Sequence, residues 1–500
     1  MRRLTVTVTL ATLLVACVPT PSPPTLPPTV RQVTLFYTSD EHGYLEARER
    51  GAYTVGGAAE LMGRLRQEGY EPDSDTALLL SGGDMWTGPA ISSWFQGASV
   101  VEVFNEMGYD AATVGNHDFD FGAEVLSANS AEMDLSLLSA NLRETASGEP
   151  PAYVQPYVIR QVNGVRVGII GLSLQSTPRI VMPAHVEGLA FGDYEEALRE
   201  TAPQVRAEGA DIVVVIAHVC PADLALLAPL AADLDISLLA GGHCHQLTTM
   251  ERAGVLVVGP GANWEAAIRV DLLYDTATGE VTEQEAQVIQ NRYRTAEGPP
   301  VEPDPDVTEI VARWAAQTDE ALGKVIGYTG TGIEIGWAMY NIVTDSWLWY
   351  YPEADLAISN LGGFREALPP GEITLADIVA TLPFENTLMD AELTGEEVLE
   401  NLRCCGGAVG GMIVHGSGPE LTVTLTDGSP LDPQATYHVL VNNYIYQGGD
   451  GYHFSQQDPD AYDTGIHWRE PVIQWIRAQG TGPDHPLESL LDDTPRGPEW

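Results

Sequence analysis

A short turn in the first quarter of the chain, GNHDFD at residues 115–120, places an amide, an imidazole and two carboxylates side by side. Taken alone, the turn is explained by the preference of Asn, Asp and Gly for turns and helix caps. The same side chains can also bind metal ions and transfer protons. The rest of the first half of the chain decides between these two explanations.

Five apolar segments in this half end in side chains of the same kind. The end groups are Asp40 with His42, Asp84, Asn116 with His117, His218, and His243 with His245. Helix-like stretches such as 57–69 and 193–209 lie between the segments, which predicts strands buried on both faces with helices packed outside. Because ligand sites in open α/β sheets form beyond the carboxyl ends of the strands, we expect these side chains to meet. Glycines precede three of the groups, where the backbone must approach closely.

The kinds of side chain at the strand ends predict the chemistry. Asp, His and Asn without thiolates favour Zn, Mn, Fe or Co over Ca or Mg alone. Two metal ions about 3.5–4 Å apart need a carboxylate that can bridge them, and Asp84 stands alone on its strand. Such a pair binds a phosphoryl oxygen and supplies hydroxide at neutral pH, so the set predicts a di-metal phosphohydrolase.

The ordered motifs resemble a known family. D-x-H, G-D, G-N-H-[DE], H and G-H-x-H are similar to the signature of calcineurin-like metallophosphoesterases, and TSDEHG, SGGD, GNHDFD and GGHCHQ resemble its 5′-nucleotidase/UDP-sugar hydrolase branch. The resemblance implies a catalytic dyad of His117 and Asp120, and a structural role for Asp118. It implies one metal held by Asp40, His42, Asp84 and His245, and a second held by Asp84, Asn116, His218 and His243. A chain that kept this fold but lost its metals is the alternative.

Three motifs in the second half are similar to the substrate domain of 5′-nucleotidases: NLGGFRE at 360–366, LPFENTL at 382–388 and NNYIYQGGDGY at 442–452. The resemblance implies that Phe384 and Tyr444 sandwich a base and that Arg365 binds phosphates or a carboxylate. The further substrate residues that it implies are Asn360, Gly363, Asn386 and Asp450. Without the resemblance, the two aromatic residues would be assigned to the core.

One departure from the family leaves the substrate open. Relatives carry one or more further arginines in the stretch that corresponds to 332–346, whereas GIEIGWAMYNIVTDS contains none. A site with Arg365 as its one arginine would bind a multiply charged phosphate tail less firmly.

Length and pattern predict two domains, because 500 residues exceed a single core. We expect an α/β fold, in which a four-layer α/β/β/α metallophosphoesterase sandwich precedes a smaller α+β substrate-binding domain joined by a linker helix. The expected ranges are 31–297 for the first domain, 298–325 for the linker helix, 326–480 for the second domain, and 481–500 for a loosely ordered tail.

The net charge of −46 excludes some partners. So negative a field repels phosphate backbones, which argues against nucleic-acid binding. It also repels anionic small molecules, so a site for one must be made locally positive by metal ions or arginine.

The first residues resemble an export signal. Residues 1–17 have a basic start, an apolar segment too short to span a bilayer, and a lipobox-like LVAC ending at Cys17, which predicts lipidation of that cysteine. Residues 18–30 are proline-rich and predict an extended spacer. The protein is therefore expected to be exported and membrane-anchored, with an ordinary cleaved secretory signal as the alternative.

The other four cysteines are too few for a disulfide scaffold and lack the spacing of a thiolate zinc site. Adjacent Cys404 and Cys405 are expected to be two buried thiols, with a vicinal disulfide as the alternative.

Two classes of function follow. The first is an exported di-metal phosphohydrolase that releases phosphate from nucleotides by in-line hydroxide attack, with UDP-sugars and 2′,3′-cyclic nucleotides as further candidate substrates. The second is a surface lipoprotein that binds nucleosides or a partner. A thiosulfohydrolase-like member of the superfamily is a variant of the first, disfavoured by Phe384 and Tyr444. The oligomeric state is left open.

Overall fold

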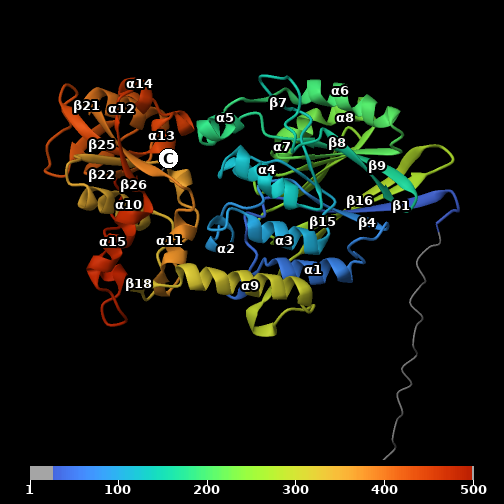
Figure 1. Ribbon diagram of the computed structural model, residues 1–500, viewed down its shortest axis with the longest axis horizontal. Coiled ribbons are helices and arrows are strands. Elements are labelled where there is room, and N and C mark those ends of the chain that lie inside the picture. Colours follow the sequence, from blue (N-terminus) through green and yellow to red (C-terminus); the bar gives the residue numbers. More distant parts are fainter. Residues whose placement is uncertain (1–25, 498–500) are drawn as a thin grey trace, which may run out of the picture.

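The computed structural model describes residues 26–497, so the predicted signal, Cys17 and most of the spacer lie outside the described residues. Figure 1 shows two lobes, the first formed by the blue to green part of the chain and the second by the orange and red part. Within the described part, no helix has the length and apolar character needed to cross a bilayer.

The first domain contains two six-stranded sheets. The first has the order β16-β15-β1-β4-β5-β6, and the second has the order β13-β14-β12-β11-β9-β8. The strands of the first sheet are β1 Val30–Thr38, β4 Ala77–Ser81, β5 Ala111–Thr113, β6 Ser136–Leu138, β15 Ala266–Asp275 and β16 Glu280–Gln290. Those of the second are β8 Tyr157–Val162, β9 Val165–Leu172, β11 Ile212–Ala217, β12 Ile236–Gly241, β13 Leu247–Arg252 and β14 Val255–Pro260. In each sheet four neighbouring strands are parallel, as the sequence predicted.

The side chains of β1 alternate between the two faces of its sheet, and this alternation explains the four layers. Leu35 and Tyr37 belong to the core between the two sheets, whereas Phe36 between them packs with the helices that cover the first sheet. The expected α/β/β/α sandwich is therefore confirmed. The first sheet is covered by α1 Ala58–Gln67, α3 Ala98–Met107 and α9 Pro305–Leu322, and the second by α6 Tyr194–Ala207, α7 Pro221–Leu224 and α8 Ala228–Asp233.

Shorter elements surround the sandwich. They are β2 Arg48–Arg50, β3 Tyr53–Val55 and β17 Arg292–Arg294 in a three-stranded sheet, β7 Leu142–Glu144 paired with β10 Leu189–Phe191, and the helices α2 Ala90–Ser93, η1 His117–Phe119, α4 Ala123–Glu132, α5 Thr177–Ile180 and η2 Pro183–Val186.

The second domain is built on a mixed five-stranded sheet with the order β22-β19-β25-β21-β26, and α10 and α15 cover one face while α12 covers the other. Its strands are β19 Leu356–Ser359, β21 Thr387–Thr394, β22 Ala408–Gly410, β25 Thr436–Asn442 and β26 Tyr462–His467. Its helices are α10 Trp337–Tyr350, η5 Leu361–Gly363, α11 Leu375–Thr381, α12 Gly395–Cys405, α13 Asn443–Tyr446, η7 Gly449–Gly451, α14 Phe454–Gln457 and α15 Arg469–Gln479. Two small pairs are β18 Val325–Thr329 with β20 Gly371–Thr374, and β23 Met412–His415 with β24 Thr422–Leu425.

Helix α9, Pro305–Leu322, joins the two domains and ends beside α11 in Figure 1. Its N-terminus is capped by the Asp304 side chain, which accepts hydrogen bonds from the N–H groups of Asp306 and Val307. The helix occupies only the later part of the predicted range 298–325, and Val325, which was expected to continue the helical pattern, begins β18.

The end of the chain differs from the prediction. Residues 481–497 were expected to be loosely ordered, but Leu487 is fully buried and the Asn341 amide of α10 donates to the carbonyls of Asp492 and Thr494. Arg496 pairs with Asp345 of the same helix. The segment contains no periodic pattern, so its packing along α10 was not visible in the sequence.

The cysteines also differ from the prediction. Cys404 and Cys405 form a vicinal disulfide at the end of α12, and Cys404 is exposed rather than buried. Cys220 and Cys244 form a second disulfide, with their Cα atoms 5.1 Å apart. Both of these lie within two residues of a predicted metal ligand, so the convergence of those ligands brings the two cysteines together.

Candidate active site

The five strand ends predicted to carry ligands meet at one place in the first domain. β1, β4 and β5 of the first sheet and β11 and β12 of the second end there, and the loops that follow them carry the polar side chains. Six of the seven predicted ligands form two groups of possible metal-binding atoms, Asp40 with His42 and His245, and Asp84 with His218 and His243. Within each group the candidate atoms lie within 4.8 Å of one another.

In the first group, acceptor atoms face one another. The Nδ1 atom of His42 donates to the carbonyl of Thr87 at 3.0 Å, which leaves a lone pair on its Nε2. That Nε2 lies 3.2 Å from Nε2 of His245, which itself lies 3.5 Å from Oδ1 of Asp40. This cluster of nitrogen and oxygen atoms suits a divalent cation, and the carbonyl behind His42 orients its ring as in many metal sites.

The second group repeats the arrangement. The Nδ1 atom of His218 donates to the carbonyl of Gly82 at 2.8 Å, which turns its Nε2 toward the other side chains of the group. This Nε2 lies 2.9 Å from Oδ2 of Asp84 and 3.2 Å from Oδ1 of Asn116, the seventh predicted ligand. The donor set therefore fits a divalent metal with nitrogen and oxygen ligands.

Asp84 lies between the two groups. Its Oδ2 atom is 2.9 Å from Nε2 of His218 in one group and 4.0 Å from Nε2 of His42 in the other. The side chain is almost completely buried. This position is the one that a bridging carboxylate requires.

The backbone at the site is strained. Asp40, His42, Asp84, His243 and His245 all have φ between 49° and 66° although none is glycine. Each such residue costs about 1–3 kcal/mol, and strain of this kind clusters at functional sites. Five of the seven predicted ligands share this conformation, so the surrounding structure holds them in place.

Two glycines permit the close backbone approach that the sequence predicted. A Cβ atom on Gly115 would lie 2.2 Å from Oδ1 of Asp84, and one on Gly242 would lie 2.1 Å from Oγ of Ser39. Neither position can accept a larger side chain without displacing its neighbours.

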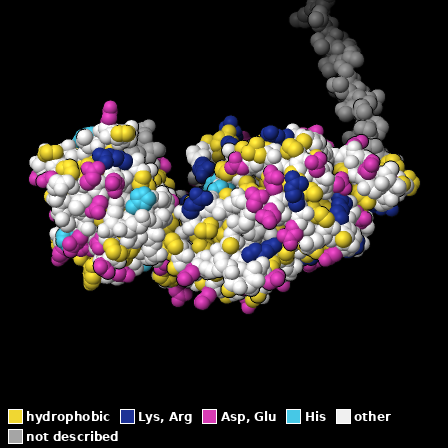
Figure 2. All heavy atoms as spheres, turned by 90° about the horizontal axis from the view of Figure 1, so that it is seen from above, with side chains coloured by type: hydrophobic (Ala, Val, Ile, Leu, Met, Phe, Trp, Pro, Cys, Tyr) yellow, Lys and Arg dark blue, Asp and Glu magenta, His cyan; other side chains and the backbone are white. Residues whose placement is uncertain are grey.

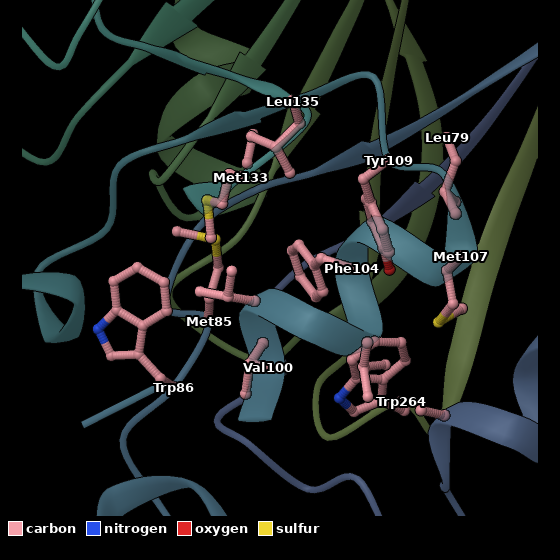
Figure 3. Packing of buried hydrophobic residues seen from close by; sticks show 14 of the residues in the cluster. Leu79, Met85, Trp86, Val100, Phe104, Met107, Tyr109, Met133, Leu135 and Trp264 are labelled. Carbon is pink, nitrogen blue, oxygen red and sulfur yellow. The ribbon is translucent and has the colours of Figure 1, made fainter. Parts of the chain in front are cut away.

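Asp118 orders the loops around the site. Its carboxylate accepts hydrogen bonds from the N–H groups of Asp84 at 3.1 Å, Met85 at 2.8 Å and Gly115 at 2.7 Å. Met85 and Trp86, which follow Asp84 directly, lie in the core around Phe104 in Figure 3. The loop that carries Asp84 is thus held by a carboxylate on one side and by the hydrophobic core on the other.

Burial shapes the electrostatics of the carboxyl groups. Burial raises the pKa of Asp40 to about 7. Burial acts in the same direction on Asp84, but the imidazoles of His218 and His117 outweigh it and hold the pKa of that carboxyl well below its usual range. Glu41, which the sequence did not single out, is fully buried, accepts hydrogen bonds from Thr38 and Ser81, and has a pKa raised by burial to about 8.

The predicted dyad is formed. Nδ1 of His117 lies 2.7 Å from Oδ2 of Asp120, and the His117 N–H donates to Oδ1 of Asp84 at 2.7 Å. Burial lowers the pKa of the imidazole, but the carboxylates of Asp120 and Asp84 outweigh burial and raise it. A carboxylate that orients and charges an imidazole is an arrangement suited to proton transfer.

A cavity of about 390 Å³ lies between the two domains and joins the dyad to the second domain. In the space-filling view a cleft separates the two lobes, and acidic side chains are spread over the visible face (Figure 2). The first domain contributes Asn116, His117, Asp120 and His243 to the cavity wall. All seven predicted substrate residues line the same cavity: Asn360, Gly363, Arg365, Phe384, Asn386, Tyr444 and Asp450.

The aromatic side chains of this cavity have defined neighbours. The ring of Phe384 stacks against His117 of the first domain, with the ring centroids 6.0 Å apart and an interplanar angle of 28°. Tyr444 donates through its hydroxyl to Oδ1 of Asp450 at 2.7 Å. The glycine at 449 makes room for Tyr444, because a Cβ there would lie 2.3 Å from its ring.

Asp450 and Arg365 have different surroundings. Asp450, predicted to contact substrate, lines the cavity. Its two oxygens also accept hydrogen bonds from Tyr444 at 2.7 Å and from Asn360 at 2.8 Å, so it positions those two side chains as well. Arg365 forms no ion pair with any residue between 26 and 497, which leaves its guanidinium free for an anion.

Other residues of the cavity wall were not predicted. An apolar strip from the first domain, Ile180 to Met182, follows α5 and faces the second domain, and Glu385, Asn443 and Gln447 add polar groups. The strip lies in a short irregular segment, so no periodic pattern identified it. The motif LPFEN contained Glu385, but nothing in the sequence showed that its side chain would reach the cavity.

Comparison with known proteins shows which proteins the chain resembles. The family model described as 5′-nucleotidase, C-terminal domain, matches residues 329–457. A 5′-nucleotidase precursor from Thermus thermophilus has a crystal structure with a TM-score of 0.79 at 25% identity, covering 93% of this chain and 99% of that one. The chain is thus similar to 5′-nucleotidases over most of its length, and residues 329–457 match the C-terminal domain of that family. Members of this family are metal-dependent phosphoester hydrolases, in agreement with the donor set described above.

Two curated relatives show how far the similarity to 5′-nucleotidase family members extends. The 5′-nucleotidase of Vibrio cholerae is 25% identical over 505 residues, which cover 89% of this chain and 90% of that protein. Endonuclease YhcR of Bacillus subtilis is 27% identical over 413 residues, which cover 75% of this chain but only 33% of that protein. The chain therefore spans a third of one relative and almost all of the other.

Proposed function

We propose that this protein is a 5′-nucleotidase-type phosphohydrolase that releases phosphate from nucleotides with two divalent metal ions. The observation that carries the proposal is the single cavity in which the His117–Asp120 dyad and the aromatic residues Phe384 and Tyr444 lie together. A purely nucleoside-binding protein has no need of a charged imidazole and converging metal ligands beside the base pocket.

The metal ligands follow from the two groups. Asp40, His42 and His245 would hold one ion and Asn116, His218 and His243 the other, with Asp84 shared between them. The nitrogen-rich donor set suits ions of the Zn, Mn, Co or Fe type. Such ions, when bound, offset the charge of a phosphoryl group and lower the pKa of an attacking water. They also offset the repulsion that a protein of net charge −46 exerts on an anion.

The side chains of the second domain bind and orient the substrate. Phe384 and Tyr444 hold the base by stacking, and Arg365, which has no ion-pair partner among the described residues, binds the phosphate. Phe384 also touches His117, so a base held there lies within a few ångströms of the dyad. Binding in this orientation converts the encounter of ester and catalytic group into a positioned reaction.

The His117–Asp120 dyad transfers the proton in the reaction. His117, charged by Asp120, donates to the phosphoryl group or to the leaving oxygen, and Asp120 keeps the imidazole in one tautomer and orientation. The backbone N–H of His117 is bound to Asp84, which ties the position of the dyad to that of the shared carboxylate.

Cellular location is part of the same proposal. Export through residues 1–17 and anchoring by lipid at Cys17 would place the enzyme at the cell envelope, and both rest on the sequence alone because those residues lie outside 26–497.

A panel of phosphate esters tests the proposal. AMP, ATP, UDP-glucose, a 2′,3′-cyclic nucleotide and bis(p-nitrophenyl) phosphate would separate monoesterase from diesterase activity. We expect phosphate release from nucleotides that is lost in Asp84→Asn and His117→Ala. If both variants matched the wild type across the panel, the protein would be a binding protein or would act on another class of substrate, such as a thiosulfate ester.

A further inference from the structure

Glu366 joins the two domains. Among the hydrogen bonds of residues 26–497, two connect the first domain to the domain that begins at β18, and both end on this carboxylate. Tyr44 donates its hydroxyl to Oε1 of Glu366, and Nη1 of Arg48 lies 3.2 Å from the same atom. The one ion pair between the domains in this part of the chain is the same Arg48–Glu366 contact.

Contacts within the first domain hold both donors, Tyr44 and Arg48, in place. The Arg48 guanidinium lies 3.7 Å above the centre of the Tyr44 ring, and its Nη2 reaches Glu265 at 3.4 Å. Arg50 also pairs with Glu265, at 2.9 Å. The two donors therefore need little reorganisation to bind one carboxylate.

Both ends of this contact lie next to the machinery described above. Tyr44 is two residues after His42, and Glu366 directly follows Arg365. Tyr44, Arg48 and Glu366 line a second cavity, of about 1040 Å³, which opens on His42 and His245. Arg365 lines both this cavity and the substrate cavity, so the position of its guanidinium depends on how the loop around Glu366 is held.

The apolar contact between the domains near the linker is small. It consists of Ala90 of α2, Leu322 at the end of α9 and Val379 of α11, with two partly buried neighbours. A small apolar interface allows two domains to move relative to each other. A polar contact on the active-site side can therefore decide how long the closed arrangement lasts.

We propose that Glu366 is a positioning residue, which binds Tyr44 and Arg48 to hold the second domain closed over the metal-ligand loop and thereby sets Arg365 at the reaction site. This inference rests on the proposed function for its kinetic consequence, because the closed arrangement matters only to a substrate that binds both domains. A nucleotide is such a substrate. A small ester such as bis(p-nitrophenyl) phosphate has no base to bind to the second domain, so its hydrolysis depends far less on domain closure.

The kinetic test compares Glu366→Gln with Glu334→Gln in the metal-loaded full chain. Glu334 is a matched control because it lines the same cavity but forms no ion pair with any residue between 26 and 497. We expect Glu366→Gln to lower kcat/KM for the nucleotide by about tenfold, mostly through KM, and to leave the small ester within about twofold. Tyr44→Phe and Arg48→Met should give smaller losses, and Arg48→Lys should retain part of the effect. Equal losses for both esters would make the role of Glu366 structural and would overturn the proposal.

The salt dependence of kcat/KM distinguishes an electrostatic role of Glu366 from a purely structural one. Because the contact is charged and partly exposed, raising salt from about 0.05 to about 0.5 M should lower nucleotide kcat/KM more in the wild type than in Glu366→Gln. An identical salt dependence in the two proteins would contradict the proposal.

Small-angle X-ray scattering tests the inference without any substrate. Glu366→Gln should have a larger radius of gyration than the wild type and Glu334→Gln, because its domains spend more time apart. If all three had the same radius of gyration and the same thermal stability, Glu366 would not hold the domains closed, even if the enzyme hydrolysed nucleotides. If Glu366→Gln had the larger radius of gyration but the wild type hydrolysed no nucleotide, the proposed function would be wrong. The role of Glu366 in holding the domains together would still be supported.

Discussion

The imidazole of His117 and the ring of Phe384 stack across the domain boundary, with their centroids 6.0 Å apart. His117 belongs to the metal-ligand half of the molecule and Phe384 to the half matched by the 5′-nucleotidase C-terminal family model. The contact joins two residues that are more than 200 positions apart in sequence, and so makes one site from two domains. A ligand that stacks on Phe384 is therefore already beside the dyad.

Replacement of the aromatic pair tests this relationship. Stacking on an aromatic side chain is worth about 1–3 kcal/mol for each base, so Phe384→Ala or Tyr444→Ala should raise KM for nucleotides by roughly 10- to 100-fold. The KM for bis(p-nitrophenyl) phosphate should change far less, because that ester has no base. Steady-state kinetics with both substrates gives the answer, and equal effects on the two would rule out the aromatic clamp.

Gly115 provides a test of the tight loop packing. Gly115→Ala would place a Cβ 2.2 Å from Oδ1 of Asp84, so the carboxylate must move. A displacement of about 1 Å at a catalytic site can cost roughly 100-fold in rate, and we expect a loss of that order in kcat. Gly482→Ala is the control, since no atom lies within 4 Å of a Cβ at that position. A fully active, metal-loaded Gly115→Ala protein would show that this approach is not needed.

Alkylation tests the two disulfides. Unfolding the protein without reductant and adding a thiol reagent should label none of Cys220, Cys244, Cys404 and Cys405, whereas prior reduction should expose all four. Mass spectrometry of the peptides distinguishes the pairs. Labelling of Cys404 and Cys405 without reduction would show that they are free thiols, as the sequence predicted.

His438 predicts a pH dependence of stability. A hydrogen bond to Asp390, 3.0 Å away, raises the pKa of this imidazole although burial opposes the rise. Because the pKa is higher in the folded state, the stabilisation is complete below the unfolded value of about 6.5 and is lost as the pH rises through the raised value.

Urea unfolding of the wild type and His438→Gln at about pH 6 and about pH 8.5 measures this difference. The wild type should be the more stable protein at the lower pH, by less than about 1 kcal/mol because the pair is partly exposed, and the gap should shrink at the higher pH. A gap that stayed constant or grew with pH would contradict the assignment of the raised pKa to Asp390.

The convergence of the candidate metal ligands could be predicted from the sequence for a physical reason. Parallel strands present their carboxyl ends at one edge, so Asp40, Asp84 and His218 are brought together by the fold class alone. The order of the motifs supplied the remaining ligands. Local sequence pattern and sheet topology were thus enough to predict the position of a side chain that directly follows its own strand.

Features that depend on contacts between distant segments could not be predicted in this way. The hydrogen bonds to Glu366 join residues 318 and 322 positions apart, and the tail along α10 makes contacts across about 150 positions. The vicinal disulfide at Cys404 was only the less favoured alternative, and the buried Glu41 was missed, because neither has a periodic pattern around it. The hydrogen bonds that Asp450 accepts from Tyr444 and Asn360 were likewise not visible in the sequence.

Metal content and phosphate release, measured together on the wild type and Asp84→Asn, test the central claim most directly. Elemental analysis should find two divalent metal ions for each wild-type chain and fewer in the variant, because Asp84 lies between the two ligand groups. Phosphate release from AMP should fall by at least about 100-fold in the variant. A wild type that binds no divalent metal, or an Asp84→Asn protein that hydrolyses AMP at the wild-type rate, would contradict the account.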